Sequence, residues 1–470
     1  MLKSNAFKAT SFSFVFTAAL LFEGCGSSDE TASNANLCYY YYVIAKSSLP
    51  EFDSNLFYTA DSLGQRLDIY VSLKESRLKF EKFSGGYRAS YIAGVRLIRD
   101  GEPPVVKEIR RVVDEAAFPT ASDSSYDAFL VSLRVTPGKY AVEIEVVDEA
   151  SGQKTSRVYD KIIPDVSGQS MSMSDILLLA SYDTVGYGRR IRPFFLSNAG
   201  LLSDTLRFFT VLSSSVSSRD SIYLKVFKLE MHERLPSGYI SPGFSGGGPN
   251  LDPCRAGVDS MLVYSYPLRA ALDPGSCYIF GGVPKPLPGN YVLEVVVENK
   301  DRNWVSALLP FRIRGKNFPD VTDDLRDMVN SLNYIASRGE LQEMVAVKND
   351  SAVKANLLKF WSDFGGYSKM AEYYRRVSRA NMYFSTCIDG WKTPMGMMYI
   401  VCGPPDYVEC RGLYTERWMY VQTSTNNRVV VDYRLSRDTP NPGDRYYGIE
   451  NIYSSLDFWS YYVSRWRSPY

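Results

Sequence analysis

Hydrophobic and polar side chains alternate along most of the first two thirds of the chain. Two runs show the pattern most clearly: apolar side chains occupy every second position from Leu67 to Leu73 and again from Tyr87 to Leu97. A period of two residues over this length is typical of a β-strand with one buried face. The pattern therefore predicts an all-β region that begins near residue 50 and ends near residue 316.

A short internal repeat divides this region in two. Residues 137–146 read PGKYAVEIEV, and residues 288–297 read PGNYVLEVVV. In both copies Pro-Gly makes a turn, and Tyr then opens a strand with the same alternation. Such a strand is typical of the late strand pair of an immunoglobulin-like sandwich. We therefore predict two immunoglobulin-like β-sandwich domains, at residues 50–168 and 169–316.

From Pro319 onward the spacing of apolar residues changes to that of a helix. Between residues 325 and 336 they recur at intervals of three and four, and Asp320 or Thr322 is the predicted N-cap. Ser351 is the predicted N-cap of a second helix. The change of period indicates that a different kind of domain begins near residue 317.

A third helix is predicted over residues 368–384. Glu372 lies three residues before Arg375 and four before Arg376, the spacings at which side chains on a helix surface form ion pairs. A pair of arginines on a helix is most often part of a solvated face. We expect that here, and a carboxylate clamp is the alternative.

After this helix the pattern again predicts strands. Met397–Val401 is a short apolar run that indicates a strand, and it must stop before Pro404 and Pro405, which lack backbone donors. Two further strands are predicted at residues 417–421 and 429–433. Residues 317–470 should therefore form an α+β domain in which helices precede a small antiparallel sheet.

The segment between the third helix and these strands carries a motif that begins Gly-Trp-Lys-Thr at residues 390–393. Over residues 320–465 the sequence resembles the GWxTD domain of bacterial envelope lipoproteins. That family has no assigned reaction, so the resemblance implies a compartment and a fold but no chemistry. The residues it marks for the motif or for binding are Gly390, Trp391, Thr393, Gly396, Tyr399, Gly403, Pro404, Pro405 and Asp406. To these we add Trp418 and Tyr420 from the predicted strand that follows the turn.

Two departures from the family pattern bear on catalysis. The family has Asp after Thr393 and Arg directly after Gly396, whereas this chain has Pro394 and Met397. A catalytic acid could not be replaced by Pro without loss of the reaction. A structural ion pair can be replaced by apolar residues at little net cost. We therefore expect the motif to serve packing and turn formation, with Trp391 buried.

The rest of the sequence adds no catalytic set. Its single histidine, His232, excludes most acyl-transfer triads and His-based metal sites. The sequence contains no His-Glu-x-x-His motif. We predict no catalytic residue, no metal and no cofactor. Carboxylate pairs remain open, so the alternative function is a carboxylate-dependent hydrolase that acts on envelope glycans.

The N-terminus is typical of a secretory signal. Two lysines precede an apolar segment at residues 12–22, which is too short to span a bilayer, and Gly24-Cys25 follows. This order resembles a lipobox, which implies removal of residues 1–24 and diacylation of Cys25. The residues just before Gly24 depart from the usual lipobox, so ordinary secretion or an uncleaved anchor is the alternative. Residues 25–49 should then form the lipid attachment site and a flexible tether.

Seven cysteines agree with export, since disulfides persist in oxidising compartments. Two local disulfides are predicted, Cys254 with Cys277 and Cys402 with Cys410. For Cys387 and Cys402, burial as small apolar residues is the alternative.

The formal net charge of +1 gives no field that would attract nucleic acid. We predict a lipid-anchored protein of the bacterial outer membrane, on either its periplasmic or its surface face, with a non-catalytic binding or scaffolding role. Its predicted partners are the membrane, through the anchor, and other envelope proteins or glycans.

Overall fold

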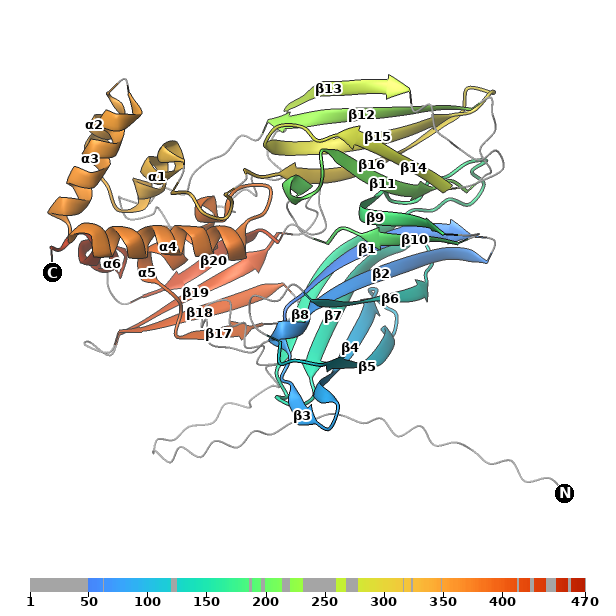
Figure 1. Cartoon of the computed structure of the whole chain (residues 1–470), viewed down its shortest axis with the longest axis horizontal. Helices are drawn as coiled ribbons and strands as arrows, with labels where there is room; N and C mark the ends of the chain where they lie inside the picture. The colour runs from blue at the N-terminus through green and yellow to red at the C-terminus, as the bar shows by residue number, and fades with distance from the viewer. Residues whose placement is uncertain are drawn as a thin grey trace. The chain divides into compact units, whose positions relative to one another are not determined.

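The structure of the chain is a computed structural model, which describes residues 50–469 except 62, 120–124, 186–187, 196–198, 214–219, 231–258, 268–277, 316, 323, 348, 412–413, 423–426, 437–444 and 455–457. Its elements form two β regions followed by a C-terminal module of helices and a small sheet (Figure 1). Every strand pair in these sheets is antiparallel. The predicted class, a multidomain β-rich chain with a C-terminal α+β part, is confirmed at this level.

The first β region has two sheets that enclose one core. One sheet has the order β1-β2-β6, and the other has the order β3-β4-β7-β8 with β5 paired to β4. Leu67, Ile69, Val71 and Leu73, which the alternation assigned to one face, are completely buried. The strands are β1 (Phe52–Asp61), β2 (Gly64–Lys74), β3 (Glu81–Phe83), β4 (Gly86–Ile98), β5 (Val105–Glu115), β6 (Tyr126–Arg134), β7 (Gly138–Asp148) and β8 (Lys154–Ile163), and the 3-10 turn η1 (Glu75–Arg77) follows β2.

The second β region also has two sheets around one core, with the orders β10-β9-β11-β14 and β13-β12-β15-β16. Its strands are β9 (Leu177–Val185), β10 (Gly188–Pro193), β11 (Thr205–Val211), β12 (Ser221–Glu230), β13 (Asp259–Pro267), β14 (Tyr278–Pro284), β15 (Gly289–Glu298) and β16 (Trp304–Ile313), with η2 (Ala199–Leu201). The repeated sequence forms β7 in the first region and β15 in the second. In both copies the Tyr hydroxyl donates to a carbonyl four residues upstream: Tyr140 to Thr136 at 3.1 Å and Tyr291 to Leu287 at 2.8 Å.

The C-terminal module packs its helices on one face of a four-stranded sheet, and their apolar side chains form one core (Figure 1). Its helices are α1 (Leu325–Ser331), α2 (Arg338–Val345), α3 (Asp350–Asp363), α4 (Gly366–Phe384), α5 (Pro394–Cys402) and α6 (Phe458–Arg467), with η3 (Leu332–Tyr334) and η4 (Gly390–Lys392). The C-terminal sheet has the order β17 (Tyr407–Cys410), β18 (Thr415–Gln422), β19 (Asn427–Leu435) and β20 (Tyr447–Tyr453). No helix in the described part of the chain is long and apolar enough to cross a membrane.

One predicted element of the module is wrong. The apolar run at residues 397–401 is not a strand, because it lies in the helix α5. A short apolar run does not distinguish a buried strand from a buried helix. The residues before it decide the outcome: Thr393 is the N-cap, and Pro394 occupies the first turn, where a missing backbone donor costs nothing.

Two predicted helix caps are also wrong. Asp324, rather than Asp320 or Thr322, caps α1 and accepts from the backbone N–H groups of Arg326 and Asp327. Asn349, rather than Ser351, caps α3. Several residues able to cap lie close together before each helix. The sequence alone does not decide which of them takes the extended backbone angles of an N-cap. The module elements α2, β17, β20 and α6 were not predicted at all.

Candidate functional site

Two glycines bring the motif close to the helix that precedes it. A β-carbon built on Gly390 would lie 1.9 Å from the carbonyl oxygen of Ala380 in α4. A β-carbon on Gly396 would lie 1.8 Å from the carbonyl oxygen of Gly390. Real β-carbons do not approach other atoms so closely. The backbones of α4, η4 and α5 are therefore in direct contact at these two glycines, with no room for a side chain between them.

Trp391 is buried as predicted, with 1% of its surface exposed. Its backbone N–H donates to Asn381 Oδ1 at 3.2 Å, and its carbonyl accepts from the Tyr334 hydroxyl at 2.7 Å. The Tyr334 ring packs edge-on against the indole at 6.4 Å, and the Lys392 ammonium lies 5.3 Å from its centroid. The indole Nε1 has no hydrogen-bond partner among the described residues. The ring therefore acts as an apolar anchor.

Thr393 connects the turn to the next helix. Its hydroxyl donates to the carbonyl of Gly390 at 2.7 Å and accepts from the N–H of Gly396 at 3.0 Å. The side chain is only 3% exposed, so both capping bonds are shielded from water. Met397 and Tyr399, on the helix that follows, are also buried in the module core.

The other end of α5 is closed by two side chains from distant helices. Arg376 donates to the carbonyl of Ile400 at 3.1 Å, and the indole of Trp466 donates to the carbonyl of Val401 at 3.0 Å. Gly403 follows with a φ of 87°, which favours glycine. The Arg376 side chain is 20% exposed, so the prediction of a solvated face is wrong for this arginine.

The solvated face is confirmed for Arg375. Its side chain is 50% exposed and pairs with Glu372. Glu372 also pairs with Arg376, at 2.8 Å, and hydrogen bonds from both guanidinium groups outweigh burial and lower the pKa of this carboxyl group. Spacing alone gives both arginines the same partner, and only the position of α5 separates their roles.

The turn after α5 sets the register of the C-terminal sheet. Pro404 is exposed and Pro405 is buried. The N–H of Asp406 donates to the carbonyl of Met419 at 2.9 Å, and its carboxylate accepts from the N–H of Val421 at 2.6 Å. Asp406 therefore holds the start of β17 against β18.

Trp418 and Tyr420 lie on the inner face of this sheet, where they are 0% and 2% exposed. The Trp418 indole donates to Glu416 Oε1 at 2.6 Å. Burial raises the pKa of the Glu416 carboxyl group, and the bond from Trp418 partly opposes that rise. The structure thus places both predicted aromatic residues in the core, away from any partner.

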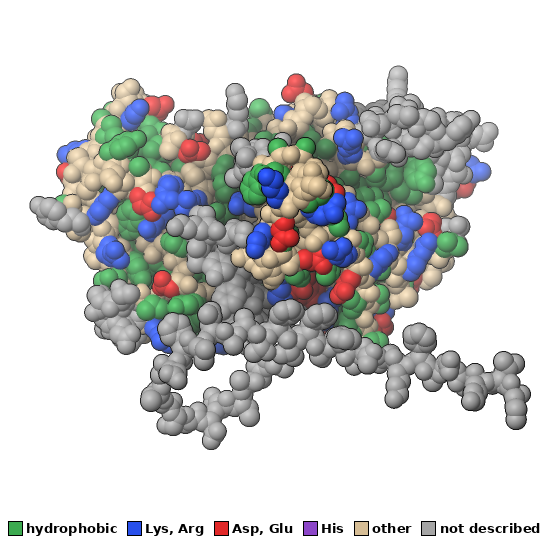
Figure 2. All heavy atoms as spheres, turned by 60° about the horizontal axis from the view of Figure 1, so that its bottom comes forward, with side chains coloured by type: hydrophobic (Ala, Val, Ile, Leu, Met, Phe, Trp, Pro, Cys, Tyr) green, Lys and Arg blue, Asp and Glu red, His purple; other side chains and the backbone are tan. Residues whose placement is uncertain are grey.

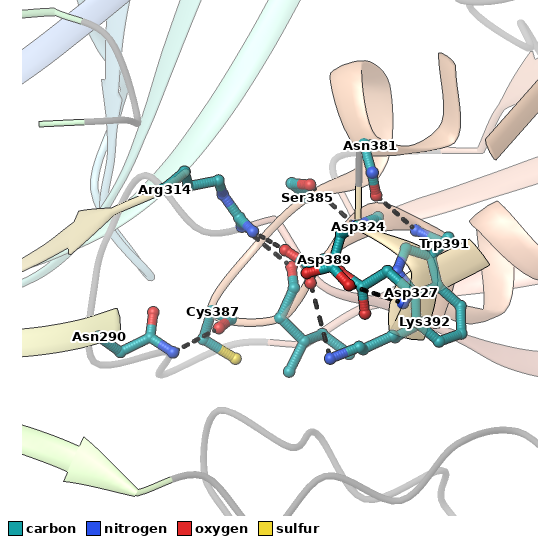
Figure 3. A network of polar contacts seen from close by, with 12 residues as sticks. Asn290, Arg314, Asp324, Asp327, Asn381, Ser385, Cys387, Asp389, Trp391 and Lys392 are labelled. Atoms are coloured by element: carbon teal, nitrogen blue, oxygen red, sulfur yellow. Dashed lines mark hydrogen bonds and ion pairs between the residues drawn. The ribbon is translucent and has the colours of Figure 1, made fainter. Parts of the chain in front are cut away.

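A polar junction joins the motif to the second β region (Figure 3). Arg314, just after β16, forms an ion pair with Asp389, and its side chain is 6% exposed. Its guanidinium also donates to the carbonyls of Thr386 at 3.0 Å and Ile388 at 3.2 Å. Lys392 approaches Asp389 from the other side at 3.6 Å. No pattern in the sequence indicated this junction, because Arg314 and Asp389 are far apart in the chain.

The cysteines differ from prediction where the structure describes them. Cys402 is a free thiol, so the predicted Cys402–Cys410 disulfide is absent, and burial raises the pKa of the Cys402 thiol. Cys387 is in a disulfide, whose other half lies outside the described side chains. The same segment is held from β15, since Asn290 Nδ2 donates to the Cys387 carbonyl at 2.9 Å. Cys25, Cys254, Cys277 and His232 lie outside the described residues.

The outer face of the C-terminal sheet carries a row of apolar side chains, which we call the aromatic row. The strand register aligns its four members, one from each strand: Tyr407, Met419, Val430 and Tyr453. The two tyrosines at the ends are 56% and 52% exposed. Met419 and Val430 between them are half-buried. The sequence could not reveal this row, because it depends on the register of all four strands.

Four charged side chains beside the aromatic row are paired with one another, whereas Arg428, two residues before Val430 on the same face, is exposed. Arg417 donates to both carboxylate oxygens of Asp432, at 2.6 and 2.8 Å, and hydrogen bonding to Asp432 raises the pKa of Arg417. Arg411 pairs with Glu409 at 3.1 Å. The guanidinium of Arg417 also lies 5.9 Å from the Tyr453 ring centroid. Figure 2 shows the same mixing of basic and acidic side chains over the face turned toward the viewer.

Within the described ranges, no three His, Cys, Asp or Glu side chains come together in a way that could hold a metal ion. Fold and site together define a β-rich multidomain protein whose C-terminal α+β module is built around a buried Gly-Trp turn.

Residues 293–468 match the family model of the GWxTD domain, so the chain contains a GWxTD domain and the resemblance in its sequence is confirmed. The match begins inside β15, before the predicted domain boundary at residue 317.

Comparisons with curated proteins and with solved structures do not identify a function. A search of the curated proteins found no match. Trypsin-activated alpha-2-macroglobulin from Escherichia coli aligns with 57% of this chain at 12% identity and a TM-score of 0.17, and the alignment covers 17% of that chain. A tetra-tandem repeat from the extending region of a large adhesion protein aligns with 56% of this chain at 9% identity and a TM-score of 0.14, covering 67% of that chain.

Proposed function

We propose that this chain is an envelope-anchored lipoprotein whose GWxTD module has a non-catalytic binding or scaffolding role. The observation that carries the proposal is the contrast between the two sides of the module. The Gly-Trp turn of the family motif is buried in the core, whereas the outer face of the C-terminal sheet exposes an aromatic row. Tyr and Trp side chains that remain exposed on a rigid sheet are typical of recognition surfaces.

The polar side chains at and beside the Gly-Trp turn are engaged in structural contacts. The Thr393 hydroxyl both donates and accepts a capping bond, and Gly390 and Gly396 serve close backbone contact. Asp389, the acidic residue next to the motif, is paired with Arg314 and Lys392. A general acid or base must reach a substrate proton, and these side chains are engaged inside the protein.

In this proposal the two β regions are immunoglobulin-like sandwiches that act as spacers between the membrane and the module. The shared role of Tyr140 and Tyr291 supports this, since each hydroxyl bonds to backbone four residues upstream. A Tyr that bonds back to upstream backbone is a recurrent feature of immunoglobulin-like domains. Their strand orders differ, which is compatible with two variants of one sandwich architecture.

The lipid anchor is tested by labelling. Cells that express the chain are grown with an alkynyl fatty acid, and the purified protein is examined for label. We expect label on the wild-type protein and none on the Cys25→Ser variant. An unlabelled wild-type protein, or equal label on both, would show that Cys25 carries no lipid.

The binding face is tested by photocrosslinking in intact cells. A photoreactive amino acid replaces Tyr407 or Tyr453 in the aromatic row, and Tyr367 on α4 is the matched control because it is 79% exposed. We expect crosslinked adducts from both row positions and none from the control. Adducts from Tyr367 alone, or from no position, would refute the aromatic row as the binding face.

The alternative function is a carboxylate-dependent hydrolase that acts on envelope glycans. One observation favours it: burial and the neighbouring Glu115 raise the pKa of Glu75 to about 7, near the value that suits a general acid. Glu75 is only 8% exposed, however, and lies in the first β region. Release of reducing sugars from cell-wall material, lost in Glu75→Gln, would support this alternative over a binding role.

A further inference from the structure

We propose that the aromatic row binds an uncharged oligosaccharide, an inference that rests on the proposed role of this face in binding. The first argument is its shape. Neighbouring strands in a sheet lie about 4.8 Å apart, so the row extends about 14 Å across the four strands. Tyr407 and Tyr453 expose their rings at the two ends, and Met419 and Val430 form a lower apolar floor between them. An elongated ligand lying across the strands would contact both rings.

The second argument is the polar chemistry beside the row. Arg417, Asp432, Glu409 and Arg411 are paired, so they present donors and acceptors without a strong net field. Asn451 lies in register with Asp432 and is exposed, and its amide adds both a donor and an acceptor. A sugar has apolar C–H faces and hydroxyl groups that both donate and accept. Its C–H faces suit the rings, and its hydroxyls suit the neighbouring polar side chains.

Other classes of ligand fit this face less well. Nucleic acid requires several Lys and Arg side chains that are free to neutralise phosphates. Arg417 and Arg411 already have carboxylate partners, and Arg428 alone would give few phosphate contacts. A stable protein interface needs about 1,000 Å² and places its strongest contacts near its centre. In the aromatic row the exposed rings lie at the edges, and the central side chains are half-buried.

The test uses the full mature chain, with Cys25→Ser to keep it free of lipid, and isothermal titration calorimetry. Cellohexaose and hexa-N-acetylchitohexaose are the uncharged probes, and hexagalacturonate is the anionic probe of similar length. We expect an uncharged probe to bind, and the double variant Tyr407→Ala/Tyr453→Ala to weaken it about tenfold or more, since each stacked ring contributes about 1 kcal/mol. Tyr367→Ala should bind as wild type does.

Three results would overturn the inference: binding of neither uncharged probe, binding of the anionic probe alone, or unchanged affinity in the double variant. If the double variant does not fold, as judged by circular dichroism, Tyr407→Ala is used alone. The proposed binding role is tested separately. If Tyr407 and Tyr453 form protein adducts in cells but no sugar binds, the aromatic row is a binding face whose ligand is a protein rather than an oligosaccharide.

Discussion

The carbonyl oxygen of Gly390 lies 1.8 Å from the position that a β-carbon on Gly396 would occupy. Gly390 in turn has the same relationship to Ala380, at 1.9 Å. The two motif glycines are therefore required by backbone packing rather than by backbone angles, since neither has a positive φ. This contact fixes where α5 begins and directs its apolar residues into the core.

Alanine at either motif glycine should destabilise the module strongly. The added methyl group must displace backbone atoms of α4 or η4, which costs more than the 1–3 kcal/mol typical of overpacking. Gly339→Ala is the matched control, because Gly339 lies in α2 with no atom within 4 Å of a new β-carbon. That change should be neutral or stabilising, since Ala favours helix over Gly by up to about 1 kcal/mol. Denaturant unfolding measures both effects, and equal stability of the Gly396→Ala and Gly339→Ala variants would contradict the packing argument.

Trp391→Ala should destabilise the module by about 3–5 kcal/mol, as expected for removal of a large buried ring. Thermal unfolding should show a fall of several degrees in melting temperature, because 1 kcal/mol shifts a domain of 150–250 residues by about 2–4 °C. Trp391→Phe keeps an aromatic ring and removes an indole N–H that has no described partner, so it should cost less. If Trp391→Ala instead left the melting temperature unchanged and abolished binding, the motif would be a recognition site.

Much of the fold follows from local patterns. Alternation assigned the buried face of β2, and helical spacing located α4 to within two residues of its start. Local patterns failed at α5, where eight of nine residues are buried and the apolar positions show no period. There the deciding signal was Thr393 followed by Pro394, a cap and a first-turn residue, which the sequence does contain.

The site was less predictable than the fold. The sequence identified the buried motif, because Trp and Gly at fixed spacing are distinctive. It could not identify the aromatic row, since Tyr407 and Tyr453 come to lie at the two ends of one row only through the register of β17 to β20. Nor could the sequence pair Arg314 with Asp389, because an ion pair between distant segments does not change the spacing of apolar residues in either segment.

The pair Arg314–Asp389 should couple the second β region to the motif. Arg314→Met removes one partner and two carbonyl contacts, and loss of one member of a buried pair typically costs about 3–5 kcal/mol. Asp389→Asn should cost less on the Arg314→Met background than in wild type. A double-mutant cycle measures this coupling, which should exceed about 1 kcal/mol for a contacting pair. Additive effects would show that the two residues stabilise the protein independently.

The same contacts bear on isolation of the module. A fragment that begins at residue 317 lacks Arg314, so we expect it to unfold at a lower temperature than one that begins at 293, where the family match starts. Limited proteolysis followed by thermal unfolding of both fragments checks this. Equal melting temperatures would show that Arg314 contributes little to the module. A less stable longer fragment would show that β15 and β16 need the rest of their sheet.

The last prediction concerns the pH dependence of the first β region. Glu75 is 8% exposed, and one of its carboxylate oxygens has no hydrogen-bond partner among the described residues. Burial, followed by Glu115 and Asp127, raises its pKa from 4.5 to about 7. A carboxyl group whose pKa is higher in the folded state binds its proton more tightly there. Its contribution to stability is therefore full below pH 4.5 and declines as the pH rises through about 7.

Glu75→Gln removes the ionisable group but keeps its shape, so the variant should gain stability over wild type as the pH rises from 4 to 8. The gain should exceed about 1 kcal/mol, because one unit of pKa corresponds to about 1.4 kcal/mol. Urea unfolding at both pH values measures it. Glu81→Gln, at an exposed position on β3, is the control and should show no such trend. A difference between Glu75→Gln and wild type that is the same at both pH values would show that Glu75 does not take up a proton on folding in this range.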